Sequence, residues 1–320
     1  MIRYRPLDSF RGVSILGMVF FTVTFRLSSD LPDVLRHNVW GSLHMGDFIL
    51  PMFLFASGVS LAYFLQKRKE KNQRQFIQDT AKRFVKLVFV GFVLSYFSSY
   101  RFFAMDEVVL CALLFLCCVF LYRLDWRIIL GIIFVINFSY LPLLSLTGEG
   151  IFIGNYLGGY PAAVYYLPIM LTGLLIGKGI LSEGLWCKKN TIILGVISSY
   201  FILFSIFIKI HKLIASPSFM MLAILVSFMI FAAVEWLFTS FGSIKEIEYI
   251  GRKPLRYWIS MYLVFIIPVW FYTEFTGESL PLQIPWIFGI LLSLGIILLL
   301  WMTSHVIDYI SWSKYLQNTP

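Results

Sequence analysis

The stretch Arg36-His37-Asn38-Val39-Trp40-Gly41-Ser42-Leu43-His44-Met45-Gly46-Asp47-Phe48-Ile49-Leu50-Pro51 joins the first long apolar run of this chain to the second. The second run, residues 45–66, is long enough to cross a bilayer as a helix, because about 20 apolar residues span the hydrocarbon core. The stretch also holds two of the four histidines among 320 residues. It therefore predicts a membrane helix whose entry carries chemically active side chains.

Spacing suggests how those side chains are arranged. If the stretch is helical, His37, Trp40, His44 and Asp47 follow intervals of three, four and three, so all four share one face. Histidine is the commonest general base, and a nearby carboxylate can orient it. We interpret this face as a candidate active site; the alternative is an outer loop whose His and Asp side chains face water.

Repeated apolar runs set the fold class. The chain is 59% hydrophobic and 13% charged, whereas a soluble domain carries about 25% charged residues. Length alone predicts about two domains. The runs predict instead one all-α polytopic membrane bundle over residues 1–320, because helices satisfy their own backbone groups in lipid. We place about ten transmembrane helices, at residues 12–29, 45–66, 84–100, 107–122, 128–146, 162–181, 191–210, 218–239, 255–273 and 284–304.

The distribution of basic residues predicts the orientation. With both termini in the cytoplasm, 21 of the 26 Lys and Arg residues fall on the cytoplasmic side. This asymmetry is what the positive-inside rule requires. The net charge of +9 is thereby explained by topology, and we expect no nucleic-acid partner. The stretch from His37 to Asp47 is placed on the opposite side of the membrane.

Metal and disulfide chemistry have little support in the sequence. His37 and His44 could form a zinc pair, but no third ligand is evident, so we expect no metal. The cysteines form no CxxC pair and are interpreted as small apolar residues; they are Cys111, Cys117, Cys118 and Cys187.

Two further segments carry charge at the predicted cytoplasmic side. Asp8 and Arg11 are three residues apart before Gly12 and can pair across a helical turn; the alternative is a helix N-cap beside a topology-setting Arg. Residues 249–258 contain Pro254, which suits a first helical turn.

Basic residues around Pro254 suggest where an anion could bind. Exposed amides at a helix start together with Arg252, Lys253 and Arg256 would suit phosphate groups, and Lys82 and Arg83 could add to them. The alternative is again charge that sets topology.

Small and aromatic residues complete the candidates. Gly173 and Gly177 predict close helix packing. Tyr156 and Tyr160 lie in a connection rich in Gly and Tyr, residues 147–161. With Trp40 they could stack on a sugar ring, and His44 joins them as a substrate-binding candidate; packing is the alternative role.

These segments together resemble the heparan-α-glucosaminide N-acetyltransferase family and its prokaryotic relatives. The start, Leu7-Asp8-Ser9-Phe10-Arg11-Gly12 before an apolar helix, looks like that of membrane acyltransferases more broadly. The discriminating part is the middle of this set: His37-Asn38-Val39-Trp40-Gly41-Ser42-Leu43 with Asp47, Pro51-Met52-Phe53-Leu54-Phe55 and Gly58-Val59-Ser60. A late segment, Gly251-Arg252-Lys253-Pro254-Leu255 with Tyr257, is similar to the family's Gly-x-Asn-Pro-like motif.

The resemblance implies an acetyl-CoA donor arriving from the cytosol and an amino sugar or glycan acceptor on the other side. It makes His37 the catalytic histidine, and we expect His37 to act as base or acyl carrier. From its helical phase we expect Asp47 to orient His37 or a neighbouring water. Thr22 stands where many relatives carry Asn, and Lys253 replaces a residue that is more often Asn. The long extramembrane head of the lysosomal enzyme is not seen, which leads us to expect a prokaryotic plasma membrane.

Two other functions stay open at this stage. One is an O-acetyltransferase acting on a polysaccharide, which keeps the chemistry and changes the acceptor. The other is a transporter or flippase, which would favour inverted repeats and polar residues at the midplane. A homodimer is also left open.

Overall fold

The computed structural model describes residues 4–36, 43–68, 73–99, 103–140, 142–143, 159–212, 215–242, 244–277 and 284–317. Across these ranges the secondary structure is helical, and no strand is present. The all-α prediction is therefore confirmed for the described residues.

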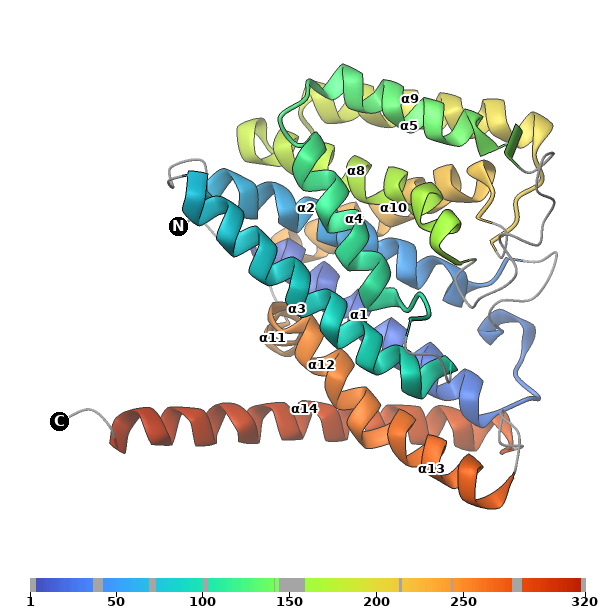
Figure 1. Ribbon diagram of the computed structural model, residues 1–320, viewed down its shortest axis with the longest axis vertical. Coiled ribbons are helices and arrows are strands. Elements are labelled where there is room, and N and C mark those ends of the chain that lie inside the picture. The colour runs from blue at the N-terminus through green and yellow to red at the C-terminus, as the bar shows by residue number, and fades with distance from the viewer. Residues whose placement is uncertain are drawn as a thin grey trace. The chain divides into compact units, whose positions relative to one another are not determined.

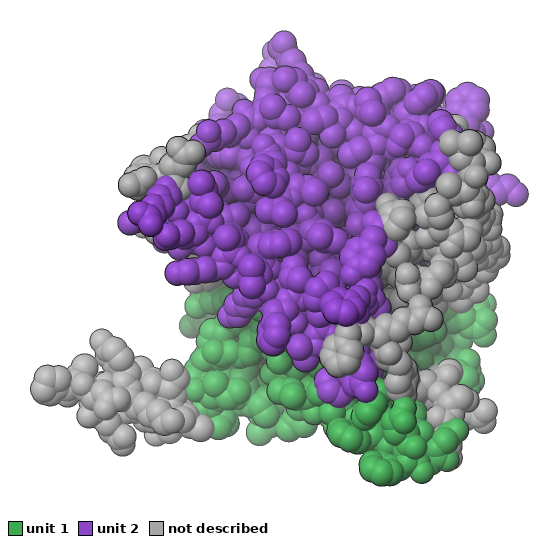
Figure 2. Space-filling view, viewed as in Figure 1, with its two compact units in different colours: residues 1–37, 243–320 green, residues 38–242 purple. Residues whose placement is uncertain are grey.

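The chain divides into two compact units, which Figure 2 shows in different colours. Unit 1 comprises residues 1–37 and 243–320, and unit 2 comprises residues 38–242. Each unit is described by itself below. Whether residues 1–320 act as one domain stays a prediction.

Unit 1 brings the two ends of the chain together. Helix α1 (Arg5–Leu27) is followed by a short turn, η1 (Asp33–Leu35). The C-terminal part contains, in chain order, α11 (Lys245–Arg252), α12 (Pro254–Met261), the π-helical turn η3 (Tyr262–Ile266), α13 (Ile267–Thr276) and α14 (Trp286–Gln317). Helix α1 packs against α11, α12 and α14 (Figure 1).

Two glycines allow α1 and α11 to touch through their backbones. A Cβ atom on Gly12 would lie 2.1 Å from the carbonyl oxygen of Ile247, and one on Gly251 would lie 1.7 Å from that of Asp8. Backbone atoms cannot move aside as flexible side chains do, so neither position has room for a side chain. The start motif and the late motif of the sequence therefore meet here, which explains the glycine in each.

Unit 2 is built around α8 (Gly159–Glu183), which packs most extensively against α2 (Ile49–Arg68) (Figure 1). A short turn, η2 (Met45–Phe48), leads into α2. The remaining helices are α3 (Gln73–Ser99), α4 (Glu107–Leu121), α5 (Trp126–Phe138), α9 (Lys188–Phe207) and α10 (Pro217–Phe241). Asp106, Asp125 and Ser216 cap α4, α5 and α10 through their side-chain oxygens, satisfying backbone donors at each helix start.

The predicted packing role of Gly173 and Gly177 is confirmed. A Cβ on Gly173 would lie 2.2 Å from the carbonyl oxygen of Phe55, and one on Gly177 would lie 2.8 Å from that of Val59. Gly58 of α2 faces Met170 of α8 in the same way, at 2.1 Å. Small residues on both helices thus let α2 and α8 approach closely, as is common between membrane helices.

In the described residues, each of the ten predicted spans overlaps a helix. In the part of the chain that the structure describes, seven helices are long and apolar enough to cross a membrane: Arg5–Leu27, Met45–Lys67, Ala163–Glu183, Lys188–Phe207, Pro217–Phe241, Pro254–Thr276 and Trp286–Asp308. Glu107–Leu121 and Trp126–Phe138 are apolar but shorter. Helix α3 is long, but its first half is rich in charged and polar residues, and it is not among the seven helices that are apolar enough to cross a membrane.

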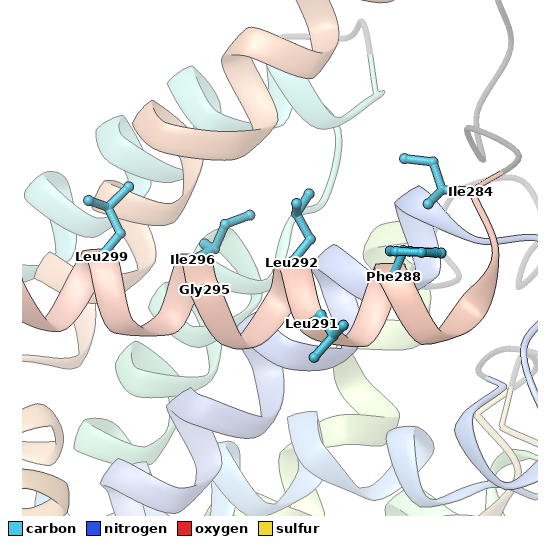
Figure 3. A pocket seen from close by; sticks show the side chains of 7 residues that line it. All are labelled: Ile284, Phe288, Leu291, Leu292, Gly295, Ile296 and Leu299. Carbon is cyan, nitrogen blue, oxygen red and sulfur yellow. The ribbon is translucent and has the colours of Figure 1, made fainter.

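Helix α14 exposes an apolar groove of about 370 Å³ (Figure 3). Ile284, just before the helix, and side chains spaced along it line the groove: Phe288, Leu291, Leu292, Ile296 and Leu299, with Gly295 among them. An apolar face of this kind suits contact with lipid chains, which agrees with α14 being one of the candidate spans.

Candidate functional site

The single helical face predicted for residues 37–47 does not form. His44 has extended backbone angles (φ −129°, ψ 163°), and helix begins only at Met45. The Asp47 carboxylate accepts a hydrogen bond from the His44 backbone N–H at 2.9 Å. This capping contact starts a helix at this point, so a helix continuing through residues 43–44 is wrong. His37 and Trp40 lie outside the described residues, and their proposed roles stay predictions.

Asp47 instead pairs with a residue that sequence reasoning did not select. Its other carboxylate oxygen lies 3.0 Å from Nζ of Lys212, and only 1% of the Asp47 side chain and 8% of the Lys212 side chain are exposed. Lys212 lies in the connection between α9 and α10. A buried pair of opposite charges is costly to place and geometrically demanding. Buried charged pairs occur both at functional sites and as structural contacts, so the pair is a candidate for part of the functional site.

Burial also changes the acidity of Lys212. Removing the ammonium from water lowers its pKa to about 8, although the Asp47 carboxylate and the Glu107 charge act in the opposite direction. At neutral pH the ion pair is intact. Lysines with lowered pKa values are common where a protein uses a charge chemically.

The segment that carries Lys212 is held in place by Ser216. The backbone N–H of His211 donates to the Ser216 hydroxyl oxygen at 2.8 Å, and the same oxygen caps α10. Phe48 of η2 packs against Phe219 of α10, with ring centroids 5.9 Å apart. Asp47 and Lys212 are thus positioned by elements that pack on each other. A lysine in a short connection, on the side with few predicted basic residues, was the only sequence signal for this contact.

Of the two tyrosine candidates, the structure describes Tyr160 but not Tyr156. The Tyr160 hydroxyl donates to the carbonyl oxygen of Phe103 at 2.8 Å, which ties α8 to the segment before α4. This contact fits the packing role that was the alternative at the sequence level. Tyr156 lies outside the described residues, so its predicted contact with a sugar stays a prediction.

The pairing of Asp8 with Arg11, one of the two alternatives for this segment, is present in unit 1. Nη1 of Arg11 lies 3.6 Å from the Asp8 carboxylate. Helix α1 begins at Arg5 after Tyr4, so Asp8 lies inside the first turn and is not an N-cap. A carboxylate in the first turn also interacts favourably with the helix dipole. Gly12, one residue later, makes the close approach to α11 described above.

A cluster of basic and acidic side chains surrounds the start of α12. Pro254 opens α12, as predicted. Lys253 and Arg256 both pair with Asp308 of α14, the second at 2.6 Å. Arg252 pairs with Glu248, which Arg5 of α1 also contacts at 2.9 Å. Sequence reasoning found the cations but missed both carboxylates.

The contacts of Glu248 with Arg5 and Arg252 change the pKa of its carboxyl group. Burial of its carboxyl group raises its pKa, but hydrogen bonds from Arg5 and Arg252 outweigh this and lower the pKa below its usual value. Glu248 is therefore ionised at neutral pH and holds the two guanidinium groups together.

The cluster retains a positive balance. Its four cations exceed its two carboxylates by two charges; the members are Arg5, Arg252, Lys253 and Arg256 with Glu248 and Asp308. A phosphate group fits such a surplus, since it can replace a carboxylate on Lys253 and Arg256.

An aromatic stack borders the same cluster. The Tyr249 and His305 rings are stacked with centroids 4.3 Å apart, and Trp301 contacts His305 edge-on at 4.7 Å. The Tyr249 hydroxyl donates to Asp308. The stack escaped sequence reasoning because Tyr249 and His305 are 56 residues apart in the chain.

Lys82 and Arg83 lie on α3, in unit 2. The Arg83 guanidinium lies over the rings of Phe64 and Phe115, at 4.9 and 5.2 Å from their centroids. This stacking accounts for the position of Arg83 without a ligand. A joint role with Arg252, Lys253 and Arg256 stays a prediction. Across the described ranges, no group of three His, Cys, Asp or Glu side chains could hold a metal ion.

The sequence matches the model of a known protein family. The family model described as heparan-alpha-glucosaminide N-acetyltransferase, catalytic, matches residues 3–185. This range includes Asp8, Arg11, His37 and Asp47 but ends before Lys212 and the basic cluster at α12. Among curated proteins, none matches the chain. Because the match covers more than half of the sequence, including the start motif and the discriminating stretch from His37, the chain belongs to the heparan-α-glucosaminide N-acetyltransferase catalytic family of membrane acyltransferases.

Proposed function

We propose that this protein transfers an acetyl group from cytosolic acetyl-CoA to an amino sugar or glycan on the opposite side of the membrane. The observation that carries the proposal is the buried ion pair between Asp47 and Lys212. Asp47 lies in the range matched by the acyltransferase family, ten residues after His37. Two charges kept out of water are costly to bury, and ionisable residues at such positions of a membrane protein are often functional.

The proposed reaction exchanges one acyl bond for another. His37 accepts a proton from the acceptor amine or hydroxyl, whose nitrogen or oxygen attacks the thioester carbonyl. The carbon–sulfur bond breaks, and the CoA thiolate leaves and takes up a proton. In the other route His37 itself carries the acetyl group before the acceptor receives it. Asp47, held by Lys212 and by the His44 N–H, would fix the local charge near this site.

The donor is proposed to bind through its phosphates at the basic cluster of unit 1. Lys253 and Arg256 currently share Asp308, so an incoming phosphate would compete with that carboxylate. Arg11, Arg252, Lys82 and Arg83 are retained as further candidates for contact with the donor. Trp40, His44, Tyr156 and Tyr160 are retained as candidates for contact with the acceptor.

We also propose the topology that this reaction requires. The seven candidate spans together with α3, α4 and α5 would make ten crossings, with both termini in the cytoplasm. The excess of Lys and Arg on that side supports this orientation. We place the protein in a prokaryotic plasma membrane, where a homodimer is compatible with the exposed apolar face of α14.

The test uses the full-length protein in vesicles, with labelled acetyl-CoA outside and acceptors inside, or the reverse, according to the measured orientation. We expect label to reach a glucosamine-type acceptor and His37→Ala to reduce the rate by about 100-fold or more. Asp33→Asn is the matched control, because Asp33 is exposed in the same connection and pairs only locally with Arg36 in the described contacts.

Two results would count against the proposal. Undiminished transfer by His37→Ala would remove His37 from the reaction and direct attention to His44. Failure of the parent protein to label any amine or hydroxyl acceptor would argue against acyl transfer itself. Parallel amine and hydroxyl acceptors separate N-acetylation from O-acetylation in the same experiment.

A further inference from the structure

Helix α3 has one face that packs on the rest of unit 2 and an opposite face that is exposed. In unit 2 it packs chiefly against α4 (Figure 1). Gly91 is on the packed side, where a Cβ would lie 2.5 Å from the Val109 side chain of α4. The opposite side carries a row of exposed residues: Lys82, Val85, Lys86, Phe89 and Val93.

The spacing of these exposed residues places them on one face of α3. Counted from Lys82, the other members follow after 3, 4, 7 and 11 residues, which brings side chains to the same side of an α-helix. Gly91 follows Lys82 by 9 residues and therefore lies about half a turn away around the axis. The exposed face is thus continuous over about 16 Å of helix and points away from α4.

Charge and hydrophobicity divide this face along the helix axis. Lys82 and Lys86 come first, and the apolar side chains continue from them, with 69% of Phe89 exposed. The charge pattern of the chain predicts that α3 begins at the cytoplasmic surface. Val93 lies about 10 Å beyond Lys86, within the roughly 15 Å that one leaflet of the hydrocarbon core measures. The lysines then lie at the level of lipid headgroups, and the apolar row lies beside acyl chains.

No carboxylate neutralises the two lysines. In the described ranges, neither the Lys82 nor the Lys86 ammonium has an ion-pair partner. The sequence of α3 contains one acidic residue, Asp79, and four basic ones: Arg74, Lys82, Arg83 and Lys86. The guanidinium of Arg83 is engaged by the rings of Phe64 and Phe115. The exposed face therefore offers two cations to an anion from outside the protein.

Charge that sets topology explains the lysines but not the apolar row beside them. Helix α9 shows the difference, because Lys188 is also exposed at a helix start on the predicted cytoplasmic side. Of the four corresponding positions on α9, three are Thr191, Gly195 and Ser199. Helix α3 has valine or phenylalanine at the same three positions. It thus combines cations with a surface for an acyl chain, whereas α9 has the cation with little such surface.

We propose that this face of α3 binds an anionic phospholipid. Lys82 and Lys86 are one turn apart, so both ammonium groups can donate to one headgroup phosphate. Val85, Phe89 and Val93 contact one acyl chain of the same lipid. The binding does not depend on the proposed acetyl transfer, because the face and its charge are properties of unit 2 alone.

The test counts lipids bound to the full-length protein in detergent by native mass spectrometry. Phosphatidylglycerol is titrated, with phosphatidylcholine as the zwitterionic reference. No CoA is present, because Lys82 is also a candidate for contact with the donor. We expect the parent to bind phosphatidylglycerol more tightly than phosphatidylcholine. Lys86→Gln should weaken the binding of phosphatidylglycerol by about fivefold, and Lys82→Gln combined with Lys86→Gln by about 25-fold.

Three further variants separate the parts of the site. Lys82→Arg combined with Lys86→Arg keeps both charges and should retain binding of phosphatidylglycerol. Phe89→Ala shortens the apolar row and should weaken binding of both lipids, because both have the same chains. Lys188→Gln is the matched control, since it removes one exposed cation from the start of α9, and it should bind phosphatidylglycerol as the parent does.

Each result decides the proposal. Preference of the parent for phosphatidylglycerol, lost in the double glutamine variant and kept in the double arginine variant, supports it. Equal binding of the two lipids by the parent overturns it, as does undiminished binding by the double glutamine variant. A loss in Lys188→Gln as large as that in Lys86→Gln also overturns it, because the effect would then be general surface charge. Unchanged binding by Phe89→Ala would do the same, since the apolar row would then have no part in the site.

Discussion

The charged side chains in two regions of this molecule differ in their exposure to water. The Asp47–Lys212 pair in unit 2 is almost completely buried, whereas Lys253, Arg256 and Asp308 in unit 1 are each about one-third exposed. In low dielectric surroundings a charge depends strongly on its single partner. Near water, partners can be exchanged at little cost.

This difference indicates different uses. A buried and closely packed ion pair has a fixed geometry, which suits a group that must stay in place during a reaction. The cluster around α12 has several cations that share two carboxylates and a positive surplus. Such a cluster can release a carboxylate and accept a phosphate. The predictions below test this contrast.

Breaking the buried pair should have the largest effect. We expect Lys212→Met to lower the free energy of unfolding by about 3–5 kcal/mol, because Asp47 is left as an uncompensated buried charge. Chemical denaturation in detergent measures this. Lys209→Met is the control, since Lys209 is exposed in the same connection.

A double variant sharpens the same prediction. Asp47→Leu combined with Lys212→Met should lose less stability than the two single changes added together, because no lone charge remains buried. Equal stability of Lys212→Met and Lys209→Met would show that the pair does not hold this region.

The stability of the region around the basic cluster should depend more on the backbone contact between α1 and α11 than on the ion pairs. Gly251→Ala would place a Cβ 1.7 Å from the carbonyl oxygen of Asp8, and we expect a loss of about 1–3 kcal/mol from the forced shift of α11. Gly131→Ala is the control, because a Cβ at that helical position meets no atom within 4 Å. It should be neutral or stabilising. A thermal unfolding series that ranks the two variants the other way would contradict this assignment.

The buried pair should also impose an alkaline limit on activity. Because burial lowers the pKa of Lys212 from 10.5 to about 8, Lys212 is charged below that pH and Asp47 keeps its partner. As pH rises through 8 the charge is lost, and transfer should fall about tenfold per further pH unit. Lys212→Arg should move this fall to higher pH, because a guanidinium stays charged. An identical alkaline fall in activity for the parent and for Lys212→Arg would exclude Lys212 as its cause.

Removing an exchangeable carboxylate should have the smallest effect. If the donor phosphates bind at the basic cluster, Asp308→Asn should strengthen CoA binding by about twofold to fivefold, since a partly exposed ion pair contributes only about 0.2–1 kcal/mol. Glu246→Gln is the control, because Glu246 is an exposed acid on α11. Calorimetry that finds both variants equal to the parent would argue against competition between Asp308 and phosphate.

Local pattern in the sequence anticipated several of these elements. Apolar runs located helices at all ten predicted spans, and Pro254 marked the start of α12. The pairing of Asp8 with Arg11 followed from their spacing within one helix. The prediction of one helical face for residues 37–47 was wrong for a local reason. The Asp47 side chain caps the backbone at His44, and hydrophobic periodicity does not reveal such a contact.

What the sequence by itself determined was the class of the protein: an all-helical membrane acyltransferase with glycines at its closest helix contacts. Only the tertiary structure decided the partners of the charges. Lys212 follows Asp47 by 165 residues and Asp308 follows Lys253 by 55, so neither pair leaves a trace in local periodicity. The physical reason is that hydrophobicity and helix spacing act within a segment, whereas the partner of a buried charge is selected by how distant segments pack.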